Sequence, residues 1–202
     1  MTERFKKVLD TNLKPFNNLY ALCDIESLEK HNITITDFLK ISIKLNAKII
    51  QYRDKKSSIQ KKIENLKFLK QNSNAVIIVN DSIDLVEYAN GVHLGQEDFF
   101  KISEDKQEAV RIIREKIGSD KLIGLSTHNE EEITEANSLD IDMVGLGAYK
   151  NTSTKDVDYI LGEKICNIAA LSVHPVCGIG GVKVDDKLNN VMFNVVASGL
   201  YT

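Results

Sequence analysis

A barrel of alternating β-strands and α-helices is the fold that this sequence predicts, and three observations predict it. Apolar segments of strand length alternate with amphipathic segments of helix length along the 202 residues. Several strand segments are apolar at consecutive positions, as in 75–79, which is typical of strands buried on both faces of a parallel sheet. Eight such segments occur, with seven connections between them. We therefore predict a (β/α)8 barrel, with a doubly wound open sheet as the alternative.

The order of the elements supports this prediction. The intervals between strand starts allow a parallel series with helical crossovers and do not favour an antiparallel sandwich. Apolar residues recur at helical spacing between strands, notably over 38–45, 59–69 and 110–117. The predicted strands cover residues 19–23, 48–52, 75–79, 91–94, 122–125, 143–146, 173–178 and 193–197.

The two ends of the chain depart from a regular barrel. The sequence stops at Thr202, soon after the last predicted strand, so we expect no helix there. An apolar stripe over 1–16 predicts an extra N-terminal helix of about three or four turns. We expect this helix to cover the barrel flank that lacks its eighth helix; the alternative cover is a second copy, in a homo-oligomer. No linker divides the chain, so we predict one domain over 1–202, with the helix in 1–16 and the barrel in 19–199.

Composition excludes several classes of partner. The chain has 26 Lys and Arg against 29 Asp and Glu, so it lacks the basic footprint of a nucleic-acid-binding protein. No apolar run approaches the roughly 18 residues of a membrane-spanning helix, and the first residues lack the apolar core of a secretory signal. Cys23, Cys166 and Cys177 form no C-x-x-C pair. We predict a reduced, cytoplasmic protein with small-molecule partners, no nucleic acid and no membrane.

Polar residues gather just after the predicted strands, where barrel enzymes carry their active sites. Arg53 and Lys55 are two residues apart, so their side chains point to the same side of an extended segment. Asp81 and Asp98 follow neighbouring strands, and a pair of carboxylates suits Mg²⁺ better than zinc. Lys155 supplies a third cation. This combination predicts a site for a diphosphate group bound with magnesium.

A second anion site is predicted after the last two strands. The glycine pair 180–181 and the Ser-Gly pair 198–199 stand where barrels commonly bind a phosphate through backbone N–H groups. Two anion sites in one cleft suggest a reaction that joins two phosphorylated substrates. Each motif alone has a simpler interpretation, such as a helix N-cap at 80–81; their joint placement at strand ends favours function. His93 and the three cysteines are interpreted as core residues.

Six segments together resemble the thiamine phosphate synthase family, and the resemblance runs from about Leu19 to the C-terminus. The most specific are GVHLGQED and TSTK. The resemblance implies a TIM barrel and a transferase of thiamine biosynthesis. This activity couples 4-amino-2-methyl-5-hydroxymethylpyrimidine diphosphate to thiazole phosphate with Mg²⁺ and releases pyrophosphate. The six segments are QYRDK at 51–55, ND at 80–81, GVHLGQED at 91–98, GLS at 124–126, TSTK at 152–155 and IGGV at 179–182.

The resemblance also implies a role for each matching residue, with Arg53, Lys55, Ser126 and Lys155 as the catalytic group. Asp81 and Asp98 would bind Mg²⁺, and residues 148–156 would form a lid. The residues that would hold the pyrimidine diphosphate are Gln51, Arg53, Lys55, Asn80, Ser126 and Lys155. Those that would hold the thiazole phosphate are Thr152, Thr154, Gly181, Ala197 and Ser198.

The sequence departs from the family pattern in three places. Residues 148–151 replace a bulky segment, residues 182–195 are about one helical turn shorter, and the eighth helix is absent. Two alternatives therefore stand beside the synthase. One is a thiazole tautomerase-like isomerase of the same barrel family, with His128 transferring the proton. The other is a non-catalytic barrel that binds a phosphorylated ligand. The retained diphosphate and magnesium residues favour the synthase.

Overall fold

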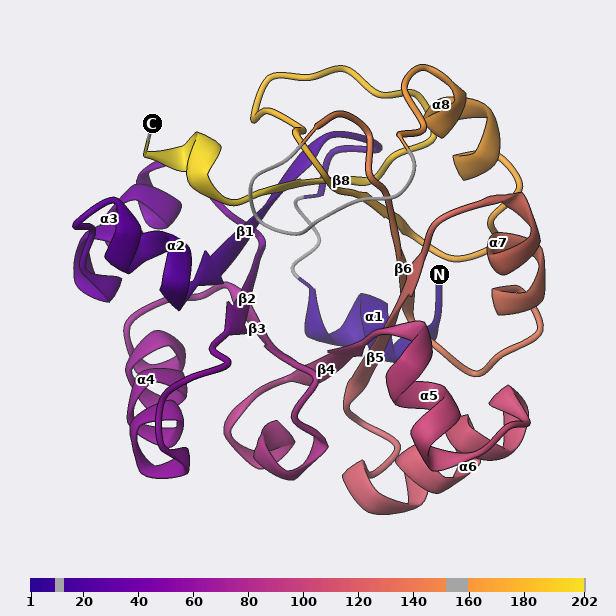
Figure 1. Cartoon of the computed structure of the whole chain (residues 1–202), viewed down its shortest axis with the longest axis horizontal. Coiled ribbons are helices and arrows are strands. Elements are labelled where there is room, and N and C mark those ends of the chain that lie inside the picture. The colour runs from indigo at the N-terminus through magenta and orange to yellow at the C-terminus, as the bar shows by residue number, and fades with distance from the viewer. Residues whose placement is uncertain (10–12, 152–159, 202) are drawn as a thin grey trace.

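The computed structural model of the chain describes residues 1–9, 13–151 and 160–201, and its centre is a closed barrel of parallel strands. Each strand pairs with the next in chain order, and β8 returns to pair with β1 (Figure 1). The (β/α)8 prediction is confirmed, and the open-sheet alternative is wrong. The strands are β1 (Asn18–Asp24), β2 (Ile49–Arg53), β3 (Val76–Asn80), β4 (Gly91–Leu94), β5 (Leu122–Thr127), β6 (Met143–Leu146), β7 (Val176–Gly178) and β8 (Phe193–Val196).

Helices surround the barrel and pack apolar faces on it (Figure 1). Several begin at a side chain that accepts a first-turn N–H, such as Thr34, Ser58 and Asn129, which satisfies a group that the helix itself leaves unpaired. Among the described residues, no helix is long and apolar enough to cross a bilayer. The helices are α1 (Glu3–Val8), α2 (Ile25–Lys30), α3 (Ile35–Lys44), α4 (Ile59–Gln71), α5 (Gln96–Ile102), α6 (Lys106–Ile117), α7 (Glu130–Ala136) and α8 (Lys164–Ala169), with 3-10 helices at Ile83–Tyr88 and Ser198–Leu200.

The last quarter of the barrel is less regular than the rest. β7 begins three residues later than predicted, because Val173 is 62% exposed and lies in a loop. Residues 179–192 contain no helix, although Leu188 and Val191 are buried in the core that the outer helices share. After β8 the described residues hold only the 3-10 helix, as expected. Tyr201 beyond it packs on α2, where its hydroxyl lies 2.8 Å from Ser27 Oγ.

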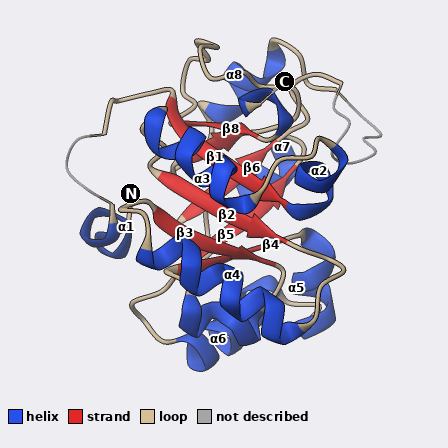
Figure 2. Ribbon diagram, turned by 90° about the vertical axis from the view of Figure 1, so that its left-hand side faces the viewer, coloured by secondary structure: helices blue, strands red, loops and turns tan. Residues whose placement is uncertain are grey.

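α1 differs from the prediction in length and in place. It spans six residues, and 13–16 are not helical. Phe5 is fully buried in the apolar cluster inside the barrel, with its ring 6.0 Å from that of Phe193 in an edge-on arrangement. Figure 2 shows α1 beside the end where the strands begin. α1 therefore closes the amino-terminal end of the barrel, and the expectation that it covers the flank is wrong.

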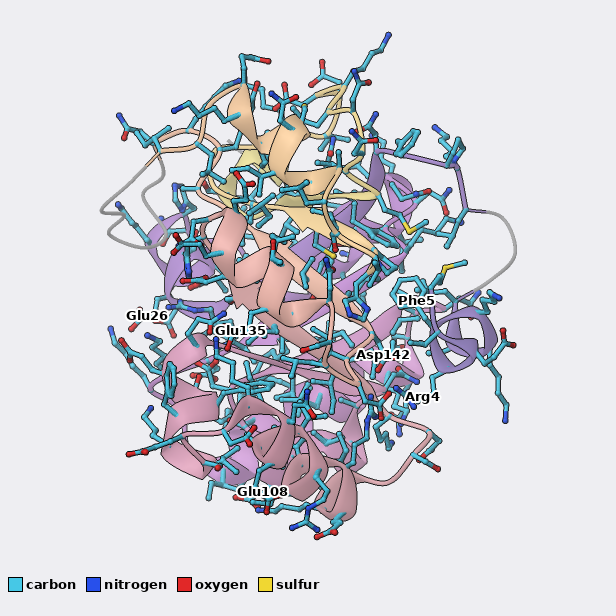
Figure 3. All side chains as sticks on the ribbon, turned by 90° about the vertical axis from the view of Figure 1, so that its right-hand side faces the viewer. Arg4, Phe5, Glu26, Glu108, Glu135 and Asp142 are labelled. Atoms are coloured by element: carbon cyan, nitrogen blue, oxygen red, sulfur yellow. The ribbon has the colours of Figure 1, made fainter. Side chains whose placement is uncertain are left out.

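A buried carboxylate fastens α1 to the barrel. Asp142, just before β6, has no exposed surface and accepts hydrogen bonds from Arg4 Nε at 3.1 Å and Arg114 Nη2 at 2.7 Å. It also accepts the backbone N–H of Ile123 at 2.9 Å and the hydroxyl of Thr2. Figure 3 shows Arg4 and Asp142 side by side, near Phe5. Because a buried charge without partners is costly, these contacts make the position of α1 specific.

The interior of the barrel changes from apolar to polar along its axis. Successive side chains of a strand point to opposite faces, so alternate residues fill the interior. Near α1 these positions hold residues such as Ile49 and Val76, members of the same apolar cluster as Phe5. Two to four residues further along, β2 and β3 present Gln51 and Asn80. The barrel therefore separates a closed apolar end from a polar rim at the carboxyl ends of its strands.

We expect Phe5→Ala to lower the free energy of unfolding by about 3 kcal/mol, because it removes a fully buried ring from the barrel interior. Urea unfolding followed by circular dichroism measures the change. The control is Phe16→Ala, since Phe16 is 44% exposed and its replacement should change stability by about 0.5 kcal/mol or less. Equal stability of the two variants would contradict the role assigned to α1.

Candidate active site

The carboxyl rim of the barrel brings together predicted site residues from distant parts of the sequence. Strand register places Asp24 of β1 beside Arg53 of β2, and Ser126 of β5 beside Gly145 of β6. Thr152, Thr154 and Lys155 lie outside the described residues. The predicted residues that are described lie in the middle or second half of a strand or after one: Gln51, Arg53, Lys55, Asn80, Asp81, Asp98, Ser126, Gly181, Ala197 and Ser198.

Asp81 and Asp98, the predicted metal ligands, lie close enough for their carboxyl groups to share a hydrogen bond. Burial raises the pKa of Asp81, and the charge of Asp98 and a hydrogen bond between the two carboxyl groups raise it further. Burial alone would raise the pKa of Asp98, but hydrogen bonds from Lys101 and from the backbone N–H of Gly95 lower it instead. Asp98 therefore loses its proton more readily than Asp81.

Two cations lie within electrostatic reach of Asp81. The positive charges of Arg53 and Lys55 both act to lower the pKa of Asp81. The guanidinium of Arg53, 15% exposed, donates to the carboxylate of Asp24, which is 3% exposed. Asp24 also accepts the N–H of Ser27 and so begins α2. One buried carboxylate thus fixes both the start of a helix and the direction of the rim arginine.

The carboxyl pair fits a magnesium ion by the chemistry of its donors. Mg²⁺ in phosphate-transferring proteins is commonly held by one or two carboxylates, with water and substrate phosphate as the other ligands. Asp98 Oδ1 accepts from Lys101 Nζ at 2.9 Å, but the Lys101 side chain is 70% exposed and has room to turn away. No group of three or more His, Cys, Asp and Glu side chains arranged for a metal occurs in 1–9, 13–151 and 160–201.

A hydrogen-bonded chain fixes two of the amide side chains. The buried hydroxyl of Tyr20 donates to Gln51 Oε1 at 2.9 Å, and Gln51 Nε2 donates to Asn80 Oδ1 at 2.6 Å. Asn80 therefore accepts from Gln51, and its own N–H groups remain available as donors. Gln51 is 6% exposed, so in this structure it orients Asn80 more than it offers itself to a ligand.

Ser126 is held by two side chains. His93 Nε2 lies 3.0 Å from Ser126 Oγ, and Gln96 Nε2 donates to the Ser126 carbonyl oxygen at 2.6 Å. Burial lowers the pKa of His93 to about 4, so its ring is neutral at about pH 7. The interpretation of His93 as a buried histidine is confirmed, and its bond to a predicted site residue is a finding of the tertiary structure.

At the predicted second anion site, two loops pack closely against each other: the one after β6 and the one after β7. Gly180 and Gly181 have φ of 86° and 66°, conformations that favour glycine. The carbonyl of Gly180 accepts the N–H of Lys150 at 2.8 Å, and a Cβ on Gly181 would lie 2.8 Å from the Asn151 carbonyl oxygen. The glycine pair thus lets Lys150 and Asn151 approach the loop after β7. The rest of the expected lid, residues 152–156, lies outside the described residues. A phosphate-binding role for Gly181, Ala197 and Ser198 remains a prediction.

Two further features bear on the alternatives. His128 follows β5 directly, with its side chain 48% exposed and Nδ1 3.0 Å from Glu132 Oε2.

A hollow of about 740 Å³ lies at the opposite end of the barrel, lined by residues such as Arg4, Lys7 and Lys121. It includes none of the predicted site residues that the structure describes, so we place the candidate active site at the carboxyl rim.

Three residues that hold predicted site residues in place were not themselves predicted: Tyr20, Asp24 and Gln96. The sequence carried a signal for Asp24, which directly follows a predicted strand just as the recognised rim residues do. Gln96 lies inside the GVHLGQED segment but was given no role. Tyr20 is a polar aromatic residue within an apolar strand, and only strand pairing shows that its hydroxyl meets Gln51.

We expect Asp24→Asn to lower the free energy of unfolding by about 2 kcal/mol, because it leaves the Arg53 charge without its buried partner. This is less than the roughly 3–5 kcal/mol of a fully buried pair, since Arg53 retains contact with water. Asparagine still begins α2 as an N-cap, so the loss reports the ion pair. Glu26→Gln is the control: it breaks an exposed pair with Lys56, and its effect on urea unfolding should be about 0.5 kcal/mol or less.

Comparisons with known proteins show which family this chain resembles. Residues 19–197 match the sequence model of the family described as thiamine monophosphate synthase. The thiamine-phosphate synthase of Dictyoglomus thermophilum is 34% identical over 174 residues, which cover 82% of this chain and 73% of that protein. That of Persephonella marina is 37% identical over 171 residues, covering 82% and 77%.

A solved structure gives the same result for the fold. The thiamine phosphate pyrophosphorylase from Pyrococcus furiosus superposes with a TM-score of 0.69 at 23% identity, covering 90% of this chain and 86% of that one. The sequence match extends from β1 to the residue after β8, so it includes the predicted rim residues from Gln51 to Ala197 and stops before Ser198. This chain therefore belongs to the thiamine monophosphate synthase family.

Proposed function

We propose that this chain is a thiamine-phosphate synthase, a transferase that couples 4-amino-2-methyl-5-hydroxymethylpyrimidine diphosphate to thiazole phosphate and releases pyrophosphate. The observation that carries the proposal is that Asp81, which shares a hydrogen bond with Asp98, lies within electrostatic reach of Arg53 and Lys55 at the carboxyl rim. A surface that combines two acidic oxygen donors with two cations suits a diphosphate bound together with a divalent cation. Family membership and the names of the relatives support the same activity.

The chemistry that this site would perform is the departure of pyrophosphate. By the resemblance, the bond between the pyrimidine methylene and the diphosphate breaks first, and the thiazole nitrogen then attacks the resulting cation. Negative charge grows on the leaving oxygens, so fixed cations nearby lower the barrier. Arg53 is aimed in advance by Asp24, which avoids reorienting its side chain during the reaction. Lys55 supplies a second positive charge, and Asn80 supplies N–H donors.

Asp81 and Asp98 are the residues that would hold Mg²⁺, which neutralises charge on a leaving diphosphate. Lys101 bonds Asp98 from an exposed position and would turn toward water when the ion binds. No general base is needed to form the new bond, because the thiazole nitrogen attacks with its own lone pair. This agrees with the setting of His128, whose described ion-pair partner is the surface residue Glu132.

The remaining roles rest on the resemblance. Thr152, Thr154 and Lys155 would contact the thiazole phosphate and the diphosphate, and Gly181, Ala197 and Ser198 would bind the thiazole phosphate. A cytoplasmic location is part of the proposal, supported by three cysteines that are free thiols. Association into a homo-oligomer is a further proposal, for which the absence of an α-helix after β8 within the described residues is the motive.

The decisive experiment measures pyrophosphate release with both substrates, with each substrate alone, and with a chelator. We expect release only when both substrates and Mg²⁺ are present. Asp98→Ala should lower kcat by about 100-fold or more, because it removes a metal ligand at the leaving group. Glu97→Ala is the matched control: the neighbouring acid is exposed on the same helix, and its loss should leave the rate nearly unchanged.

Other outcomes point to the alternatives. Isomerisation of the thiazole phosphate that persists in chelator and disappears in His128→Ala would assign the chain to the tautomerase. Binding of the pyrimidine diphosphate without turnover, measured by calorimetry, would assign it to a binding protein. Either result would overturn the synthase proposal.

A further inference from the structure

The His93 ring occupies a slot that the barrel leaves open for it. His93 on β4 pairs in register with Gly124 on β5, and Gly145 on the next strand, β6, lies close to Cε1 and Nε2 of the ring. A Cβ on Gly124 would lie 2.4 Å from His93 Nδ1, and one on Gly145 would lie 3.0 Å from Cε1. Real Cβ atoms do not approach that closely without displacing their neighbours. Two glycines in adjacent strands therefore make the space in which this ring sits.

The two ring nitrogens of His93 have different surroundings. Nε2 lies 3.0 Å from Ser126 Oγ. Nδ1 is buried and has no hydrogen-bond partner among the described residues. A buried N–H without an acceptor is costlier and rarer than a buried acceptor without a donor. The hydrogen of the neutral ring therefore belongs on Nε2, which makes His93 the donor to Ser126.

This assignment decides what Ser126 can do. A hydroxyl that accepts a hydrogen bond from His93 keeps its own hydrogen for another partner. The serine carbonyl is bonded to Gln96 Nε2 at 2.6 Å, so the backbone at Ser126 is also held. The hydroxyl hydrogen is then free to turn toward the rim, and His93 cannot act as the base that would convert Ser126 into a nucleophile.

We propose that His93 is a positioning residue, whose Nε2–H holds the Ser126 hydroxyl as a hydrogen-bond donor to an acceptor atom of the pyrimidine substrate. This rests on the proposed function, in which Ser126 faces that substrate. Gly124 and Gly145 contribute to this positioning, because a side chain at either position would displace the His93 ring from its place beside Ser126.

The first test reads the hydrogen position in the native protein. ¹⁵N NMR of the histidine rings at about pH 8, where a histidine of ordinary pKa is neutral, shows which nitrogen carries hydrogen. The chain contains its own references, because carbonyl oxygens only accept. His174 Nε2 lies 3.1 Å from the Ala136 carbonyl, and His31 Nδ1 lies 2.7 Å from the Ser27 carbonyl. We expect His93 to match His174; the pattern of His31, or a mixture, would overturn the proposal.

The second test is a double-mutant cycle on the rate of pyrophosphate release. His93→Leu removes the donor while filling the slot, and we expect kcat/KM to fall about tenfold. Ser126→Ala should cause a loss of about tenfold or more. If His93 acts only through Ser126, the double variant should resemble Ser126→Ala alone, and His93→Gln, which keeps an N–H donor, should stay within about threefold of the native rate.

The outcomes separate this proposal from the proposed function. Losses that multiply in the double variant would show that His93 supports the barrel by packing alone, which overturns the positioning role while the synthase activity stands. A native protein that releases no pyrophosphate overturns the substrate role of Ser126 and the synthase proposal together, whatever the NMR shows of the His93–Ser126 bond.

Discussion

The closure of eight parallel strands into one barrel is the constraint on which the rest of this structure depends. Closure directs every second side chain of each strand into a shared interior and leaves the carboxyl ends of all strands at one rim. At the other end, Phe5 of α1 fills the interior, and Asp142 ties α1 in place.

Three ionisable groups of the described rim have a partner before any ligand arrives. Arg53 is held by Asp24, Asp98 by Lys101, and Asp81 by Asp98. These pairings differ in how easily water or a ligand can replace one of the partners. The Arg53–Asp24 pair is nearly buried and orients the arginine lastingly, whereas Lys101 is largely exposed and exchanges its partner at little cost. A diphosphate with a divalent cation would thus meet a fixed arginine and a carboxyl pair that is readily released.

Much of the fold could be predicted because its signals are local. Apolar runs marked all eight strands, and helical periodicity marked α3, α4 and α6, since burial on one or both faces is recorded directly in the residue pattern. The N-terminal apolar stripe correctly indicated that Phe5 is buried, but the same stripe includes Phe16, which is exposed. Periodicity says that a segment has an apolar face and does not say which surface that face covers, so the place of α1 was predicted wrongly.

The candidate site, like the fold, could be predicted from the sequence only in part. The sequence by itself determined the chemistry of the rim, because Arg53, Asp81 and Asp98 each follow a recognisable strand, and strand ends of a parallel barrel must meet. Only the tertiary structure decided the partners: Asp24 for Arg53, Tyr20 for Gln51, and His93 for Ser126. The reason is physical. Which side chains touch depends on strand register and on the space left by residues such as Gly124, and neither is written in the pattern of one segment.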